Sequence, residues 1–303
     1  VRYWEIGNET YLAGDRSGPV DPGMYASALR TFATKMKKVD PDIKIGAVGP
    51  RTPTATGGSV EGKERKPWWP TVTRHAGKHI DFAVVHWYVG GSHIDLRSLP
   101  TAVPRVDATI RNLDQFFQDR LGRSVPMALT EWNVNKRVEL RGMAAGTMLG
   151  ELIGRFVEAD VDMGALWPLR FPGGSHRFRA LLDHKTDAPH SMYKVMNLFA
   201  SNLKGRLVEC TDTAADLYTV ASVQENGQQV TVFVINKPVV REKRTVTITL
   251  DNFGPRSASA VALEAENPMK GTVQRRPVDL THSGGRYSCT VRPFSILMMQ
   301  FSK

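Results

Sequence analysis

Two carboxylates in this sequence stand where they could carry out chemistry. Glu9 follows an apolar segment that contains Trp4 and Ile6, and Glu131 follows the segment Met127-Ala128-Leu129-Thr130. A glutamate at such a point is commonly an exposed ion-pair partner, but both of these emerge from segments that read as buried strands. Cleavage of a glycosidic bond requires two carboxylates: one protonates the leaving oxygen, and the other attacks the sugar or activates water.

Polar side chains accompany this pair. Asn8 directly precedes Glu9, and His86 and Tyr88 close a third apolar segment. Because side chains alternate along a strand, His86 and Tyr88 should point to the same side. For His86 the alternative is a core histidine that is hydrogen-bonded to the backbone.

Three tryptophans are candidates for contact with a sugar. Trp167 ends a later apolar segment, and Trp68 and Trp69 lie in a loop rich in Gly, Thr and Pro. Each could be an ordinary core residue. An indole at the end of a strand also offers a flat apolar face on which a sugar ring can stack, so we expect Trp167 to form a wall of the site, with Trp68 and Trp69 as less secure candidates.

The elements that must position these residues alternate over the first two hundred positions. Strands are expected at residues 3–9, 43–50, 81–88, 126–131 and 163–169, and helices at 21–38, from the late sixties into the seventies, and at 106–121, 143–157 and 189–203. Nearly continuous apolar strands, each followed by a helix, are typical of a parallel sheet covered by helices. In a parallel β/α barrel the functional side chains lie at the C-terminal ends of the strands, where the candidates above fall.

The pattern changes after Gly205. Short alternating strands are expected at residues 207–210, 217–223, 230–235, 244–250, 258–263, 287–291 and 295–301, separated by turns such as Glu225-Asn226-Gly227. This pattern predicts a small antiparallel β-sandwich. We therefore expect two domains, residues 1–204 and residues 205–303.

The composition excludes several classes of protein. The chain has 303 residues, of which 41% are hydrophobic and 23% are charged, as in a folded globular protein. It contains no run of about 18 apolar residues, so we expect no membrane span. The net charge of +10 is spread along the chain without a basic block interleaved with aromatics, so we expect no nucleic-acid partner.

The two cysteines, Cys210 and Cys289, form neither a Cys-x-x-Cys pair nor part of a His/Cys cluster. A structural zinc site is therefore not expected. Both lie in predicted strands, so a disulfide between them and two separate thiols are equally open alternatives. We expect no metal and no organic cofactor, and the sequence specifies neither a compartment nor an oligomeric state.

Several segments together resemble a known group of enzymes. Residues 3–9, Tyr-Trp-Glu-Ile-Gly-Asn-Glu, resemble the strand-four motif of retaining glycoside hydrolases with a (β/α)8 barrel, in which an Asn precedes the acid/base Glu. Residues 129–134 resemble their strand-seven nucleophile motif, and residues 81–88 resemble strand six. With a C-terminal sandwich that ends in Arg-Pro-Phe-Ser at residues 292–295, the chain is most similar to the α-L-arabinofuranosidases of glycoside hydrolase family 51. Families 39, 30 and 79 are related alternatives.

This resemblance implies a fold and a role for each candidate residue. The fold class is α/β, a partial (β/α)8 TIM barrel with strands four to eight present, followed by the antiparallel β-sandwich. Glu9 would be the general acid/base, and Glu131 the nucleophile, with their carboxyl groups roughly 5–5.5 Å apart. Asn8 would bind the 2-hydroxyl of the sugar. The implied substrate-binding residues are Asn8, His86, Tyr88 and Trp167, of which His86 and Tyr88 would also orient Glu131.

The implied activity is that of a retaining glycoside hydrolase acting on carbohydrate. It would cleave terminal α-L-arabinofuranosyl residues from arabinose-containing oligo- or polysaccharides by double displacement. The alternatives are a related β-xylosidase, glucanase or glucuronidase, or a non-catalytic carbohydrate-binding protein. Because no segment before Tyr3 corresponds to strands one to three, we expect that an N-terminal part is absent and that this chain alone is inactive or poorly folded.

Overall fold

The computed structural model describes residues 1–12, 20–57, 66–89, 96–103, 106–134, 141–173, 179–238 and 242–303. The chain divides into two compact units. Unit 1 comprises Val1–Tyr88, Arg105–Trp132 and Phe156–Trp167, and unit 2 comprises Val89–Pro104, Asn133–Arg155 and Pro168–Lys303. Over the described ranges, no helix has both the length and the apolar character needed to cross a membrane.

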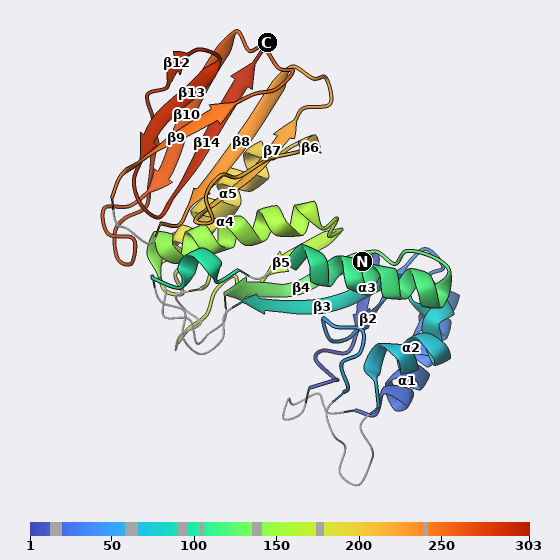
Figure 1. The fold of residues 1–303 in the computed structure, drawn as a ribbon. Helices are drawn as coiled ribbons and strands as arrows, with labels where there is room; N and C mark the ends of the chain where they lie inside the picture. Colours follow the sequence, from blue (N-terminus) through green and yellow to red (C-terminus); the bar gives the residue numbers. More distant parts are fainter. Residues whose placement is uncertain are drawn as a thin grey trace. The chain divides into compact units, whose positions relative to one another are not determined.

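Unit 1 is built on a parallel sheet that forms half of a barrel. Its strands lie side by side in sequence order, which confirms the predicted parallel β/α arrangement (Figure 1). The register places Glu5 opposite Gly46, and Val48 opposite Val84. The strands are β1 (Tyr3–Ile6), β2 (Lys44–Val48), β3 (Phe82–Val89), β4 (Met127–Val134) and β5 (Met163–Leu166).

The five predicted helices are all present, with ends close to those expected. In the first of them the Asp21 side chain accepts hydrogen bonds from the backbone N–H groups of Gly23 and Met24, and Pro22 occupies the first turn, which explains why the helix begins there. The helices are α1 (Pro22–Val39), α2 (Trp68–Ala76), α3 (Val106–Leu121), α4 (Gly142–Glu158) and α5 (Ser191–Asn202), with short 3₁₀ turns η1 (Gly77–His79) and η2 (Leu99–Thr101).

A buried tyrosine of α1 ties the helix to the first two strands. The Tyr25 hydroxyl donates a hydrogen bond to the Ile6 carbonyl oxygen at 2.9 Å and accepts one from the Val48 N–H at 2.8 Å. Ile6 is the last residue of β1, three residues before Glu9. The contact therefore fixes the point from which the chain turns toward the candidate site.

The expectation that Trp68 and Trp69 contact sugar is wrong. Both begin α2 and are fully buried, and their indole N–H groups donate to the carbonyl oxygens of Val48 and Pro50 at 2.8 and 2.7 Å. A side chain at Gly49 would overlap the Trp69 ring, so the glycine is what admits the indole. These tryptophans pack α2 against the carboxyl end of β2.

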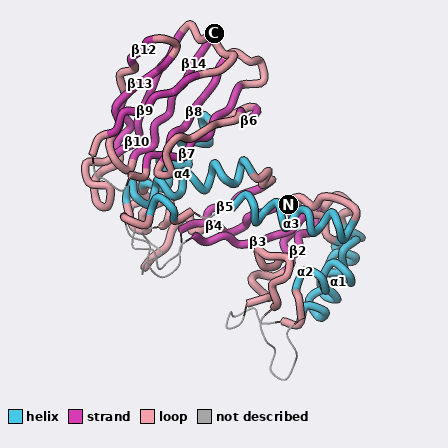
Figure 2. The backbone as a smooth tube through the Cα atoms, in the orientation of Figure 1, coloured by secondary structure: helices cyan, strands magenta, loops and turns pink. Residues whose placement is uncertain are grey.

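Unit 2 contains two antiparallel sheets. The first has six strands in the order β11-β10-β14-β8-β7-β6, and the second has three in the order β12-β13-β9 (Figure 2). The strands are β6 (Arg206–Val208), β7 (Leu217–Val223), β8 (Gln229–Asn236), β9 (Arg244–Thr249), β10 (Ser257–Glu264), β11 (Gln274–Pro277), β12 (Thr281–Ser283), β13 (Arg286–Val291) and β14 (Ser295–Ser302).

Side chains from both antiparallel sheets share one hydrophobic cluster. Val234 and Leu297 contribute from the larger sheet, and Val246 and Val291 from the smaller one. The antiparallel strands are thus confirmed, while the sandwich architecture and the boundary between residues 204 and 205 stay predictions.

The two cysteines are free thiols, so the disulfide alternative is wrong. Cys210 is half-buried and Cys289 is buried, and burial raises the pKa of the Cys289 thiol to about 11. This thiol is therefore protonated, and so weakly reactive, over the physiological range.

Candidate active site

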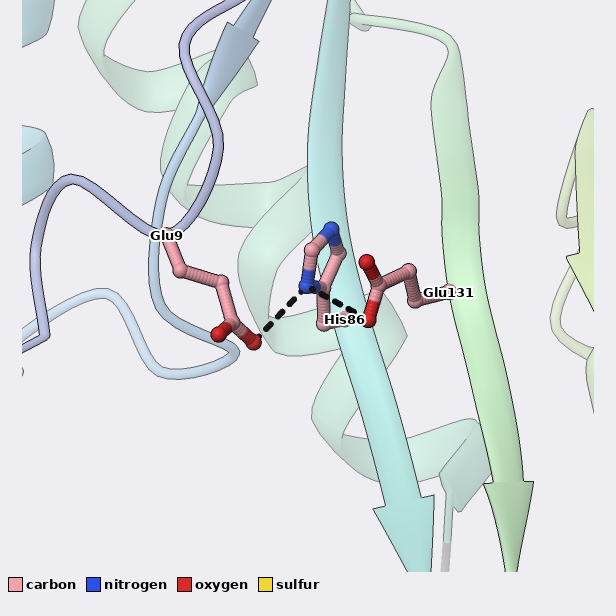
Figure 3. Close-up of side chains that lie close together, drawn as sticks. All are labelled: Glu9, His86 and Glu131. Atoms are coloured by element: carbon pink, nitrogen blue, oxygen red, sulfur yellow. Dashed lines mark hydrogen bonds and ion pairs between the residues drawn. The ribbon is translucent and has the colours of Figure 1, made fainter. Parts of the chain in front are cut away.

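Three residues that are far apart in the sequence meet at the parallel sheet (Figure 3). His86 of β3 lies between Glu9, which follows β1, and Glu131 of β4. Nδ1 of His86 donates a hydrogen bond to Oε1 of Glu9 at 2.9 Å and lies 3.5 Å from Oε2 of Glu131. One oxygen of each carboxylate and this nitrogen all lie within 4.8 Å of one another.

Glu9 is held by a tight turn beyond the end of β1. Gly7 has a φ of 88°, a conformation that favours glycine, and Glu9 itself has a φ of 47°. The turn is closed by a 2.8 Å hydrogen bond from the Leu12 N–H to the Glu9 carbonyl oxygen. A glutamate kept in the left-handed region by its surroundings is a feature that concentrates at functional sites.

Glu131 lies at an irregularity of β4 and has a direct hydrogen-bond donor. The register between β4 and β5 shifts between Leu129 and Trp132, and such shifts re-aim side chains. The Tyr88 hydroxyl donates a 2.7 Å hydrogen bond to Oε2 of Glu131. Tyr88 and His86, two residues apart on β3, therefore both face this carboxylate, as strand alternation predicted.

Trp167 and Asn8 differ in how closely they approach the other candidates. Trp167 is half-buried beyond β5, and its ring meets Tyr88 edge to face at 6.5 Å between centroids. Asn8 is exposed beside Glu9, and over the described ranges no hydrogen bond of its side chain is recorded. Trp167 thus borders the site, whereas Asn8 adjoins it through the backbone alone.

The carboxylates around His86 govern its protonation. Its side chain is only 5% exposed, and burial, the largest single influence, favours the neutral ring. The hydrogen bond to Glu9 and the charges of Glu131, Glu9 and Glu5 outweigh that influence, so the pKa of His86 is raised above its ordinary value. Among the described residues its recorded partners are carboxylates and not backbone groups, unlike the core histidine considered as the alternative.

Sequence reasoning missed a third carboxylate. Oε1 of Glu5, on β1, lies 3.9 Å from Nε2 of His86. Burial raises the pKa of Glu5; the Thr130 side chain and then the charge of His86 oppose this effect, and the charge of Glu131 adds to it. The signal that could have found it is strand alternation, because Glu5 shares the face of Tyr3, whose ring contacts Phe82 on the His86 face of β3.

Tyr11 and Arg51 were also missed, because both lie in loops. The Tyr11 ring meets Trp68 edge to face at 5.8 Å, and its pKa is raised by burial and then by the charge of Glu9. The Arg51 guanidinium lies 4.8 Å from the centre of the Trp87 ring and donates a long hydrogen bond of 3.5 Å to the Tyr88 carbonyl oxygen. Neither loop carries the regular spacing from which a side chain's direction can be predicted.

The spacing of Glu9, His86 and Glu131 would also allow a metal ion to be held, and within the part of the chain that the structure describes this is the one such group. Carboxylate oxygens and an imidazole nitrogen suit a divalent transition metal. The hydrogen bond and ion pairs among the three residues already account for their approach. The expectation that no metal takes part stays a prediction.

Chemically, the group joins a carboxylate on a turn, a carboxylate on a strand and a shared imidazole. Glu9 and Glu131 are close enough for one to act as an acid and the other as a base on the same bond. The Tyr88 hydroxyl and the Trp167 indole lie beside them. Such a group is suited to acid-assisted displacement at a carbon atom.

Comparison with known proteins gives no match to a family model and none to a curated protein sequence. Solved structures do match. The α-L-arabinofuranosidase of Thermotoga maritima, in complex with arabinose, superposes with a TM-score of 0.73 at 21% identity, covering 100% of this chain and 66% of that one. The family 51 arabinofuranosidase of Xanthomonas axonopodis pv. citri gives 0.74 at 15% identity, with coverage of 100% and 66%.

A family 44 xyloglucanase of Paenibacillus polymyxa also matches, with a TM-score of 0.70 at 14% identity and coverage of 100% and 66%. This chain therefore spans about two thirds of the length of these structures. These three similar structures are all glycoside hydrolases, of which one is a member of family 51 and one a member of family 44. The chain has the fold of the corresponding part of the family 51 α-L-arabinofuranosidases.

Proposed function

We propose that this protein is a retaining glycoside hydrolase that releases terminal α-L-arabinofuranosyl residues from arabinose-containing oligo- or polysaccharides. The observation that carries the proposal is the close approach of Glu9 and Glu131, which have one oxygen each within 4.8 Å of the other. Retaining glycosidases separate their two carboxyl groups by about 5–5.5 Å, whereas inverting enzymes leave about 6.5–9.5 Å for a water molecule.

Glu9 is the general acid and Glu131 the nucleophile. In the first step Glu131 attacks the anomeric carbon, the glycosidic bond breaks, and Glu9 gives its proton to the leaving oxygen. In the second step Glu9 takes a proton from water, which attacks the same carbon and releases Glu131. The Tyr88 hydroxyl supports this assignment, since its hydrogen bond to Oε2 of Glu131 steadies the attacking carboxylate.

The remaining site residues have supporting roles. Asn8 binds the 2-hydroxyl of the sugar, His86 and Tyr88 orient Glu131, and Trp167 forms an apolar wall. The edge-to-face contact of Trp167 with Tyr88 supports the last role, because it sets an indole next to a residue that touches the nucleophile. We further propose that β1 to β5 are strands four to eight of an eight-stranded barrel, in a domain that ends near residue 204 and precedes a β-sandwich.

The substrate class is supported by the structures that share this fold, among which family 51 arabinofuranosidases recur. A bifunctional glucanase-xylanase from a metagenome library and family 44 enzymes are also similar, so the substrate has to be tested directly. Release of nitrophenol by the full-length protein from a panel of arabinofuranosides, xylosides, glucosides and glucuronides measures the preference. We expect the arabinofuranoside to be cleaved with the highest kcat/KM. Saccharide binding without turnover of any glycoside would favour a carbohydrate-binding protein instead.

The nucleophile is tested by Glu131→Gly in the full-length protein. The variant should lose hydrolysis of aryl arabinofuranosides, and added azide should restore part of it by attacking in place of the missing carboxylate. A matched control is Glu225→Gly, at an exposed turn between β7 and β8. Turnover unchanged in Glu131→Gly would refute the assignment.

A further inference from the structure

His86 uses both of its ring nitrogens, and the reaction proposed above accounts for one of them. Nδ1 faces Glu9 and Glu131, the two residues that carry the chemistry. Nε2 faces Oε1 of Glu5 at 3.9 Å. Glu5 has no part in the two displacement steps, so its presence beside this ring needs an explanation.

The sheet directs Glu5 toward His86. Glu5 is the third residue of the four-residue strand β1, and the residue opposite it on β2 is Gly46, which has no side chain. The strand that carries His86 is the next one beyond β2. The Glu5 side chain is 23% exposed, and among the described residues its one recorded ion pair is with His86.

Burying a charged carboxylate lowers the stability of the folded protein unless the carboxylate interacts with a partner. Burial leaves the charge of Glu5 poorly solvated and so raises its pKa; the side chain of Thr130 and then the imidazole of His86 offset part of that cost. The contact between Glu5 and His86 also affects the orientation of the imidazole ring. With Nε2 facing Glu5, Nδ1 is directed toward Glu9, and its N–H has two carboxylates within reach.

We propose that Glu5 is a positioning residue that orients the imidazole of His86 through Nε2 and thereby holds the Nδ1–H between the two catalytic carboxylates. The proposal rests on the proposed function, since it gives Glu5 a role in the same site. Glu5 touches neither the sugar nor the leaving group in this scheme. Its effect on the reaction passes through the position of the His86 ring.

Other ionisable groups act on this pair and have to be kept unchanged in any test. His86 is influenced by Glu9 and Glu131 as well as by Glu5, and Glu5 by Glu131 as well as by His86. The charge of Glu5 also reaches two tyrosines. These are Tyr11, in the turn after β1, and Tyr25 of α1.

The test compares Glu5→Gln and Glu5→Ala with the unchanged protein. The glutamine keeps the size of the side chain and removes its charge, and Glu225→Gln, at an exposed turn of unit 2, is the matched control. Two experiments are carried out: steady-state kinetics that give kcat and KM across pH on the best-cleaved nitrophenyl glycoside, and an NMR titration that gives the midpoint of the His86 ring. The NMR measurement does not require turnover.

Because the negative charge of Glu5 favours the imidazolium, its removal should move the His86 midpoint to lower pH in both variants. We expect kcat to fall by roughly tenfold in Glu5→Ala and by less in Glu5→Gln, with KM within about twofold of the unchanged protein, the pattern of a residue that acts on the transition state without binding substrate. The limb of the pH profile that reports His86 should shift in the same direction.

A His86 midpoint that does not move in Glu5→Gln overturns the proposal, whether or not kcat falls, because a merely structural role would leave it unchanged. If Glu5→Ala fails to fold, Glu5→Gln still decides the question. Failure of the proposed function would look different: the unchanged protein would turn over no glycoside, while the NMR comparison would still report on Glu5.

Discussion

The group of charges around His86 in unit 1 is balanced differently from the ion pairs of unit 2. In the ion pairs of unit 2, each acid lies against one or two basic side chains. Lys237, which follows β8, forms an ion pair with Glu151 of α4 in which both side chains are almost completely buried. Arg244 donates two hydrogen bonds of 2.8 and 2.6 Å to Asp216, which lowers the pKa of that carboxyl. In these pairs the acid is matched by at least one positive charge, and the pairs hold elements together.

In unit 1 one imidazole serves three carboxylates. His86 faces Glu5, Glu9 and Glu131 within 3.9 Å. The group therefore carries more negative than positive charge at any pH at which the carboxylates are ionised, and a proton bound there has several competing acceptors. From this comparison we infer that acids balanced by basic side chains stabilise the fold. A group with three acids around one base is instead suited to proton transfer.

The strongest test of this comparison is to remove the proposed general acid, Glu9. Glu9→Gln should lower kcat/KM by about 10²–10⁴-fold on a substrate whose leaving group needs protonation, which is the usual contribution of a general acid. The loss should be far smaller for an aryl arabinofuranoside with an acidic phenol, because that leaving group departs unprotonated. Parallel kinetics on the two substrates check this. An equal loss on both would contradict a role in protonation.

Removing an acid from an ion pair of unit 2 should lower stability and leave activity unchanged. Glu151→Gln leaves Lys237 buried without its partner, which should lower the free energy of unfolding by about 3–5 kcal/mol. Chemical denaturation measures this change. Activity of the folded fraction should be unaffected, and replacing both residues with Leu and Met should recover much of the stability. A loss of kcat in the folded protein would mean that this pair is not purely structural.

The smallest expected effect concerns the donor to the nucleophile. Tyr88→Phe removes the 2.7 Å hydrogen bond to Glu131 and keeps the ring that meets Trp167. A hydrogen bond to a charged group contributes about 1.5–3 kcal/mol, so kcat should fall roughly 10- to 100-fold. Steady-state kinetics with a thermal unfolding control measure it. An unchanged kcat would show that Glu131 is oriented without Tyr88.

Much of the fold could be predicted, because its local signals agree with its tertiary structure. The helix predicted at residues 106–121 has those ends, and the strands fall within a few residues of their predicted positions. Strands β11 and β12 were not predicted, since Gln274–Pro277 and Thr281–Ser283 are exposed, polar and without alternation. Their pairing with β10 and β13 comes from tertiary structure alone.

The site was predictable in part for a similar reason. The ends of parallel strands meet at one edge of a sheet, so Glu9, His86 and Glu131 could be grouped from their positions along the chain. The burial of Trp68 could not be foreseen, because it depends on space left by a glycine of the irregular connection before it, Gly57, as well as on the start of a helix. Glu5 was overlooked because its partner lies two strands away.

The most direct test of the central claim is to trap the covalent intermediate. The Glu9→Ala variant, given an aryl arabinofuranoside with an acidic leaving group, should form the glycosyl-enzyme and hydrolyse it slowly, because no base remains to activate water. Intact-protein mass spectrometry detects the adduct, and proteolysis locates it. Our account predicts one arabinosyl group on the peptide that contains Glu131. An adduct on another residue, or turnover without any adduct and with inversion at the anomeric carbon, would contradict it.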